Sequence, residues 1–197
     1  MQAQKGARQV MNLIADDQNL LKRIARQDQD ALRSLYARHQ VRTYRFLFRL
    51  VRNEASAEEL TNEVFLEVWR NAGKFEGRSS VSTWILSIAH NRAVSQLRKR
   101  RDENWDEEKA ARLVDEDDDP EVSVQKADKG EVIRRCLEEL SDEHREIIDL
   151  VYYHEKSVAE VSAIVGIPEA TVKTRMFYAR KRLSEILRSA GVDRGWP

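Results

Sequence analysis

This chain has little of what disulfide-linked, turn-rich or membrane-spanning proteins require. Among its 197 residues there is one cysteine, Cys136, which excludes an internal disulfide and a paired-cysteine metal site. Seven glycines and three prolines are few for a turn-rich β architecture and favour helices. No apolar run approaches the roughly 20 residues that span a bilayer, and the basic N-terminus lacks the apolar core of a signal peptide. We therefore expect an all-α, cytoplasmic protein without membrane insertion, in which Cys136 is a buried thiol rather than a redox sensor.

The sequence also lacks the residue patterns on which most enzymes depend. Its four histidines are scattered, no HExxH metal motif occurs, and no glycine-rich loop is present to cradle a phosphate. We therefore expect a protein that is not an enzyme, with no catalytic residue, no metal site and no cofactor.

The formal net charge of zero conceals three segments of different charge. Residues 1–101 carry 19 Lys and Arg against 10 Asp and Glu, a net charge of +9. Residues 102–130 carry 4 against 12, a net charge of −8, and residues 131–197 carry 11 against 12, a net charge of −1. Runs of like charge such as Asp115–Asp119 repel one another and resist packing. The sequence thus predicts two modules with basic faces, joined by an acidic linker.

The last third of the chain carries signals for two helices around a tight turn. Ser157 and Glu160 fit a capping box at the start of a short helix. Gly166 supplies the backbone freedom for a sharp turn, and Pro168 fits the start of the next helix. Residues 169–188 of that helix contain six basic and two acidic residues. Its inner face is predicted to carry five apolar residues, Val172, Met176, Ala179, Leu183 and Leu187. This pattern is typical of a helix-turn-helix whose second helix enters the DNA major groove, although a bundle with a solvated basic face remains the alternative.

Helical periodicity also runs through the first hundred residues. Apolar residues recur at helical spacing around residues 20–24 and over residues 31–51. Ser56 and Glu59 fit a second capping box, which starts a further helix. Residues 73–80 are predicted to form a loop.

A last helix of this module is predicted from about Val81 to Arg101. Between Trp84 and Arg101 it carries five basic residues and no acidic one. Basic charge attracts the phosphate backbone, and an interleaved aromatic ring suits unstacked bases. The alternative is that Trp84 is a core anchor and that residues 98–101 form a solvated helix end.

Four stretches, taken together, resemble RNA polymerase sigma factors of the extracytoplasmic-function (ECF) type. Residues 28–36 resemble the opening helix of that family, and residues 57–69 resemble its helix that grips the polymerase clamp. Residues 82–93 resemble the helix that reads the promoter −10 element, and residues 166–180 resemble the helix that reads the −35 element. The four occur in the same order as in the family.

The resemblance implies an organisation of two small helical domains. Residues 16–101 would form sigma domain two, which binds core polymerase and the −10 element. Residues 102–130 would be a flexible acidic linker, and residues 131–190 would form sigma domain four with its helix-turn-helix. A leader of residues 1–15 and a tail of residues 191–197 have no assigned role.

The resemblance also implies a function and a set of contact residues. The protein would bind core RNA polymerase, recognise −35 and −10 elements of promoter DNA, promote initiation and be controlled by an anti-sigma factor. Tyr178 stands where the family often has Arg. The contacts implied are, for core polymerase, Glu59, Asn62, Glu63, Leu66 and Trp69; for the −10 element, Phe75, Arg78, Ser79, Trp84, Asn91, Arg92 and Arg98; and for the −35 element, Lys173, Thr174, Arg175, Phe177, Tyr178 and Arg180.

Two other functional classes compete with this interpretation. A stand-alone transcriptional regulator would bind duplex DNA specifically without polymerase, and an adaptor would sequester another regulator but would need no basic helix. We also hypothesise that residues 102–130 thread the active-site or RNA-exit channel of the polymerase, the alternative being a solvated spacer. Replacement of Asp115–Asp119 by serines would then change abortive initiation; an unchanged abortive pattern would argue for the spacer.

Overall fold

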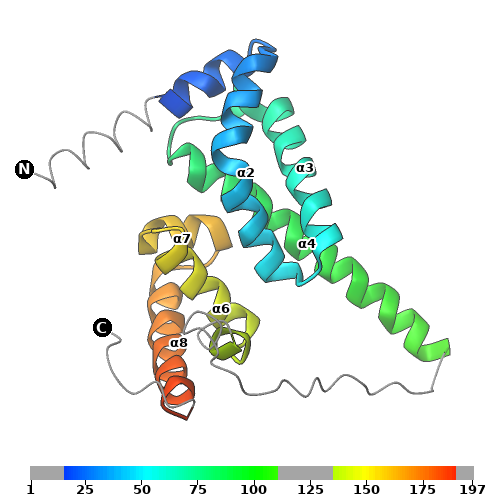
Figure 1. The fold of residues 1–197 in the computed structure, drawn as a ribbon, viewed down its shortest axis with the longest axis vertical. Helices are drawn as coiled ribbons and strands as arrows, with labels where there is room; N and C mark the ends of the chain where they lie inside the picture. Colours follow the sequence, from blue (N-terminus) through cyan, green and yellow to red (C-terminus); the bar gives the residue numbers. More distant parts are fainter. Residues whose placement is uncertain (1–15, 111–134, 190–197) are drawn as a thin grey trace, which may run out of the picture.

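The computed structural model describes residues 16–110 and 135–189, and within these two ranges it contains helices and no strand (Figure 1). The all-α expectation is confirmed. Between residues 102 and 110 the description covers the backbone alone. The first set of elements comprises helical residues 16–24, α2 (Gln29–Val51), α3 (Glu54–Asn71), the 3₁₀ turn η1 (Ala72–Lys74) and α4 (Val81–Ala110). The second set comprises helical residues 135–138, α6 (Asp142–Ile148), η2 (Asp149–Tyr153), α7 (Val158–Val165) and α8 (Glu169–Ser189).

The capping box predicted at Ser56 is wrong, because Asn53 caps α3. The side chain of Asn53 accepts a hydrogen bond of 2.9 Å from the backbone N–H of Ser56, so the helix begins at Glu54. Both residue types are good N-caps, and they stand three positions apart. The hydroxyl of Ser56 has two other partners, the Asn53 side chain at 2.8 Å and Arg100 of α4 at 2.6 Å. Ser56 therefore helps to join α3 to α4 instead of starting α3.

Helix α4 continues to Ala110, nine residues beyond the end that the sequence predicts at Arg101. Residues 102–110 contain no Gly or Pro and include Asp, Glu, Lys and Ala, of which Glu, Lys and Ala are good helix formers. The first part of the predicted linker is therefore helical. Its remainder, residues 111–130, lies outside the described residues, as do the predicted leader and tail.

The helix-turn-helix forms as its sequence predicts. Ser157 and Glu160 make a complete capping box, in which each side chain accepts from the backbone N–H of the other. Gly166 takes φ of 72° at the end of α7, and its N–H donates to Ser162 O over 2.9 Å. Four of the five apolar residues predicted on the inner face of α8 are buried and Met176 is half-buried against the core; the four are Val172, Ala179, Leu183 and Leu187.

Helix α6 runs into a π-helical turn, η2 (Asp149–Tyr153). Such a turn holds one more residue than the α-helical turn it replaces. Within it, the side chain of Asp149 is 3% exposed and faces α2. The side chain of Tyr153, at the end of the turn, is 48% exposed.

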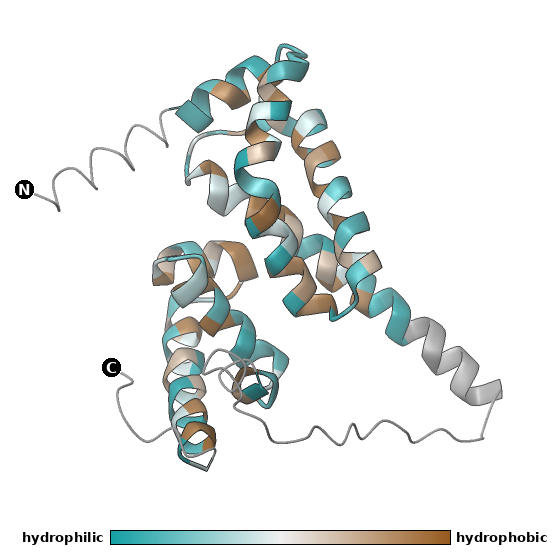
Figure 2. Cartoon of the chain, in the orientation of Figure 1, coloured by the Kyte–Doolittle hydropathy of each residue, from teal (hydrophilic) through white to brown (hydrophobic). Residues whose placement is uncertain are grey.

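The two sets of helices share one apolar core. Phe46 of α2 and Ile85 of α4 belong to the same buried cluster as Leu150, Val161 and Ile164 of the second set. A smaller cluster within the second set surrounds Cys136, which is 2% exposed, so the buried thiol is confirmed and burial raises its pKa. Figure 2 shows hydrophilic and hydrophobic residues alternating along α8. No helix in the described ranges combines the length and apolar content needed to cross a membrane.

Candidate nucleic-acid and polymerase interfaces

The outer face of α8 presents two aromatic rings and several cations to solvent. Phe177 is 64% exposed and Tyr178 is 54% exposed, and their rings lie edge to face with centroids 5.4 Å apart. Lys173, Thr174 and Arg180 are also exposed. Five of the six residues predicted to contact the −35 element therefore lie on one helix with their side chains accessible.

Arg175 differs from its neighbours on α8. Its side chain is 25% exposed and pairs with Glu143 of α6 at 3.0 Å. No local sequence pattern indicates this pair, because the two residues lie on different helices. A contact of Arg175 with a base or phosphate would therefore compete with this ion pair.

On the other set of helices, the loop before α4 packs two aromatic residues together. The rings of Phe75 and Trp84 lie 5.3 Å apart, and both residues are half-buried against the core. Trp84 therefore has the anchoring contacts that the sequence left as an alternative, and one part of it stays accessible. Arg78 is exposed and pairs with Glu76 in the same loop, while Asn91 is exposed on α4.

Two further residues predicted at the −10 element occupy opposite ends of this region. Ser79 is half-buried in the loop, and its hydroxyl donates to Ser80 O over 3.3 Å. Arg98 is exposed on α4, four turns after Trp84.

Arg92 links the predicted −10 helix to the predicted polymerase-binding helix. Its guanidinium donates to Glu67 at 2.6 and 2.8 Å and to Glu63 at 3.3 Å. The hydrogen bond to Glu67 raises the pKa of Arg92. Glu63 and Glu67 are one helical turn apart on α3, a spacing that could have indicated a shared cationic partner. The predicted DNA contact Arg92 and the predicted polymerase contact Glu63 are thus bound to each other.

A hollow of about 370 Å³ lies beside the loop that precedes α4. It is lined by Phe75, Glu76 and Gly77 of the loop and by Lys22 and Arg26 near the first described helix. Gly77 adopts φ of 73°, a backbone conformation that other residues rarely take. Lys22 and Arg26 are not among the site residues predicted from the sequence. Their basic side chains, in and just after the first helix, could have indicated a phosphate contact.

The outer face of α3 combines acidic, amide and apolar groups. Glu59 and Asn62 are exposed, and Leu66 beside them is 53% exposed. Trp69 is instead half-buried against the core. A hollow of about 350 Å³ adjoins Asn62 on this face, with Tyr36, Gln40, Tyr44, Glu58 and Thr61 as its other walls.

A polar cluster joins the start of α4 to α7. Glu160 accepts from the hydroxyl of Thr83 at 2.6 Å, and Lys156 donates to Ser82 at 2.7 Å and to Thr83 at 3.1 Å. Burial alone would raise the pKa of Glu160, but hydrogen bonds from Thr83 and Ser157 and the charge of Lys156 lower it to about 2. Glu160 therefore stays ionised while it both caps α7 and holds α4.

A hydrogen bond and an ion pair also join α4 and α2 to α6 and η2. His90 of α4 lies 2.6 Å from Glu146, and Arg49 of α2 pairs with the buried Asp149. His154 is 7% exposed and packs its ring edge to face on Phe46, with centroids 5.5 Å apart. Asp149 lies 3.4 Å from His154, yet burial and three nearby cations prevail and lower the pKa of His154 to about 4; the cations are Arg49, Arg42 and Lys156.

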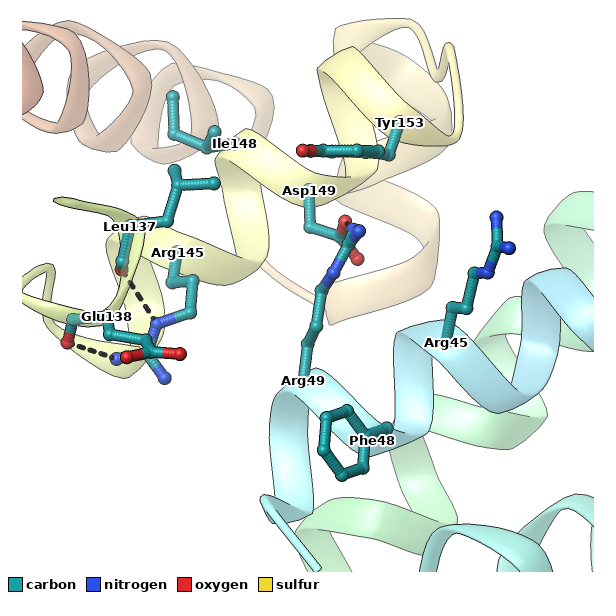
Figure 3. A pocket seen from close by; sticks show the side chains of 9 residues that line it. All are labelled: Arg45, Phe48, Arg49, Leu137, Glu138, Arg145, Ile148, Asp149 and Tyr153. Atoms are coloured by element: carbon teal, nitrogen blue, oxygen red, sulfur yellow. Dashed lines mark hydrogen bonds and ion pairs between the residues drawn. The ribbon is translucent and has the colours of Figure 1, made fainter. Parts of the chain in front are cut away.

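Figure 3 shows a groove of about 530 Å³ between the end of α2 and the α6–η2 segment. The guanidinium of Arg49 crosses it and lies 3.9 Å from the ring centroid of Tyr153. Phe48, 43% exposed, lines one wall, and Arg145 on the other wall donates to the backbone oxygens of Leu137 and Leu140.

In residues 16–110 and 135–189, no group of three or more His, Cys, Asp or Glu side chains is placed to hold a metal ion.

Comparison with known proteins identifies the family to which both sets of helices belong. The family Sigma-70 region 2 matches residues 35–103, and the family Sigma-70 region 4 matches residues 130–183. ECF RNA polymerase sigma factor SigK of Mycobacterium bovis is 35% identical over 178 residues, which cover 89% of this chain and 95% of SigK. SigK of Mycobacterium tuberculosis has the same identity and coverage. The chain belongs to the ECF RNA polymerase sigma factors.

Two solved structures have the same fold. The sigma factor RpoE of Bartonella quintana, solved in complex with the anti-sigma factor NepR, is 26% identical with a TM-score of 0.66. The match covers 82% of this chain and 98% of RpoE. CnrH, solved with the cytosolic domain of CnrY, is 22% identical with a TM-score of 0.63 over 88% of this chain and 98% of CnrH. In this ECF sigma factor, α2 to α4 correspond to region 2 and the helix-turn-helix to region 4.

Proposed function

We propose that this ECF sigma factor binds core RNA polymerase in the bacterial cytoplasm, reads −35 and −10 promoter elements and helps to open the duplex. The observation that carries the proposal is the presence of two different nucleic-acid faces in one chain. Helix α8 offers an exposed basic and aromatic face suited to the major groove of a duplex. The hollow beside Phe75 offers an aromatic wall with Lys22 and Arg26, which suits an unstacked base and its phosphate.

The two faces suit two states of DNA that occur together only at a melting promoter. A base held outside the stack costs a few kcal/mol of unstacking, which contacts in a pocket must offset. The Phe75 hollow can supply such contacts, and Arg78 is exposed in the same loop while Asn91 is exposed on α4. In the proposed complex, α8 holds duplex DNA while the α4 side holds one strand. Neither face needs a cofactor or a catalytic group.

The exposed face of α3 supports binding to the polymerase. Leu66 stands among Glu59 and Asn62, so an apolar contact is surrounded by groups that can hydrogen-bond a basic partner. An anti-sigma factor is the proposed regulator, supported by the solved complex of the related RpoE with NepR.

The deciding experiment is purification with bacterial core polymerase and run-off transcription from a promoter library. We expect core-dependent initiation at promoters that share one −35 and one −10 sequence. Leu66→Asp should weaken binding to core polymerase, whereas Val41→Asp, a matched change at an apolar residue on α2 that is 48% exposed, should not. Tight, specific duplex binding by the protein alone, without association with core polymerase, would support the stand-alone regulator instead.

A further inference from the structure

Phe177 and Tyr178 form an apolar patch on the outer face of α8. They are the two most exposed of the large apolar and aromatic side chains in the part of the chain that the structure describes. An exposed apolar patch surrounded by polar residues is typical of an interaction site. We propose that this patch binds the C5-methyl group of thymine in the −35 element, so that the two residues select thymine there. The inference rests on the proposed function and adds to it the kind of base that α8 recognises.

The patch lies on the face of α8 that is turned away from the core. Val172 and Ala179, on the opposite face of the helix, are buried. Lys173 and Thr174 are exposed, and each stands four residues before one of the two aromatic residues, so the four side chains share adjacent turns of one face. All four belong to the first half of α8, and a recognition helix contacts base edges through its N-terminal part. The patch is therefore placed to meet base pairs in the major groove.

Cations surround the patch on the same helix. Four basic residues before and after it are exposed: Lys173, Arg180, Lys181 and Arg182. Of these, Arg182 pairs with Glu185 over 3.5 Å. An apolar centre within a cationic surrounding fits the major groove, where base edges lie between two phosphate backbones. An apolar surface of another protein would cover the two rings but would leave the cations without opposite charges.

Thymine is the one base that presents an apolar group in the major groove. Its C5-methyl group projects there beside the O4 acceptor, whereas adenine, guanine and cytosine present hydrogen-bonding groups. The ring carbons of Phe177 and Tyr178 offer neither a donor nor an acceptor. They gain from contact with a methyl group, and they would remove water from a polar base edge without replacing its hydrogen bonds. The chemistry of the patch therefore favours thymine over the other three bases.

The two rings hold each other in place before DNA binds. They lie edge to face, with centroids 5.4 Å apart and an angle of 78° between their planes. An aromatic side chain has only two rotatable torsion angles, so a contact made through it loses little conformational entropy. The pair can thus cover a methyl group without first having to be ordered.

The test compares thymine with deoxyuridine, which lacks only the C5-methyl group. A duplex library randomised over the −35 element is made once with thymine and once with deoxyuridine, and the polymerase holoenzyme selects from each. We expect thymine to be enriched at one or two adjacent positions. Deoxyuridine should bind there about fourfold more weakly, the factor for one buried methyl-sized group. At the same position, 5-methylcytosine should bind more tightly than cytosine.

Variants of the patch show which side chains detect the methyl group. Tyr178→Ala and Phe177→Ala should each lower the thymine-to-deoxyuridine affinity ratio from about four towards one. Tyr178→Phe should keep the ratio, because the ring carbons remain. Tyr153→Ala, a matched change at an exposed tyrosine of η2, should also keep it. A ratio is compared within each variant, so a general loss of stability does not alter it.

The outcomes separate this inference from the proposed function. A ratio of about one in the unsubstituted protein would overturn the inference, as would a ratio that survives both alanine variants. Alanine variants that lose binding to core polymerase and keep the ratio would make the patch a protein contact, which also overturns it. Failure of the holoenzyme to initiate would defeat the proposed function. The same libraries are therefore also selected with the free chain, and absence of thymine enrichment there as well would overturn the inference independently.

Discussion

The two helices predicted to read DNA differ in how free they are. On α8, Phe177 and Tyr178 are more than half exposed and the cations around them point to solvent, apart from Arg175. On α4, Arg92 is bound by α3, and the first turn is held by α7. The outer face of α8 is thus accessible to a partner, whereas part of α4 is bound to other helices of the protein. The difference predicts that a −10 contact by Arg92 requires release of its bonds to α3, whereas the predicted −35 contacts of the exposed α8 residues require only docking.

Phe46→Ala should have the largest effect on stability, because Phe46 is buried in the apolar core that the two sets of helices share. Its side chain is fully buried and packs on His154 of the second set of helices. We expect a loss of about 3–5 kcal/mol in the free energy of unfolding, typical of a large aromatic residue truncated in a core. Urea denaturation followed by circular dichroism measures it. Phe48→Ala, two residues along the same helix and 43% exposed, should cost less than about 1 kcal/mol; equal losses would show that the shared core is not formed in solution.

Arg175→Ala should weaken promoter binding through the −35 element by roughly 1–3 kcal/mol, the value of a good base contact. The measurement is the affinity of the polymerase holoenzyme for promoters with intact and scrambled −35 sequences. An equal loss on both would mean that Arg175 contacts only phosphate. The matched variant Glu143→Gln frees Arg175 from its ion pair and should strengthen binding slightly.

Acid should destabilise the folded protein through His154. Its pKa is about 4 in the folded protein and about 6.5 in the unfolded chain, so between these values the unfolded chain alone binds the proton. The free energy of unfolding should therefore fall as the pH drops, by about 2 kcal/mol from this residue between pH 7 and pH 5. Denaturation measured at several pH values over that range should show a weaker pH dependence of the unfolding free energy for His154→Gln. The pH dependence should be unchanged for His144→Gln. An undiminished pH dependence in His154→Gln would assign the effect to other groups.

The smallest effect tests whether Arg92 reads DNA or only joins α4 to α3. Arg92→Ala should cost about 1 kcal/mol of stability, because its carboxylate partners are partly exposed. Asn91→Ala, its exposed neighbour, should leave stability unchanged and impair open-complex formation without loss of core binding. In the charge swap Arg92→Glu with Glu67→Arg, stability should recover while open-complex formation stays impaired. Full recovery of initiation by the swap would give Arg92 a structural role alone.

Local signals were sufficient to predict much of the fold. The capping box at Ser157, the turn at Gly166 and the inner face of α8 depend on neighbouring residues, and each forms as predicted. The error at Ser56 arose where two good caps stand three residues apart, and tertiary contact with Arg100 decided between them. Local sequence gives helix starts and faces, but it cannot rank competing caps.

The packing of the two domains could not be predicted from the sequence. Thr83 and Glu160 are separated by 77 residues, and His90 and Glu146 by 56. No local pattern marks such pairs, and the acidic segment between them predicted only two modules joined by a linker. The contact residues assigned to promoter and polymerase remain predictions; the structure shows which of them are accessible and which, as with Arg92, already have a partner.

The extra residue of the π-helical turn η2 sets the angle at which α7 and α8 are rotated about the axis of α6. Each residue of an α-helix turns the chain by about 100°. Deletion of Val151 would convert the π turn into an α turn and rotate α7 and α8 by about that angle around the axis of α6. Glu160 would then face away from Thr83, although no residue of the helix-turn-helix had changed. The length of this five-residue segment thus sets which side of the DNA-binding motif is turned inward.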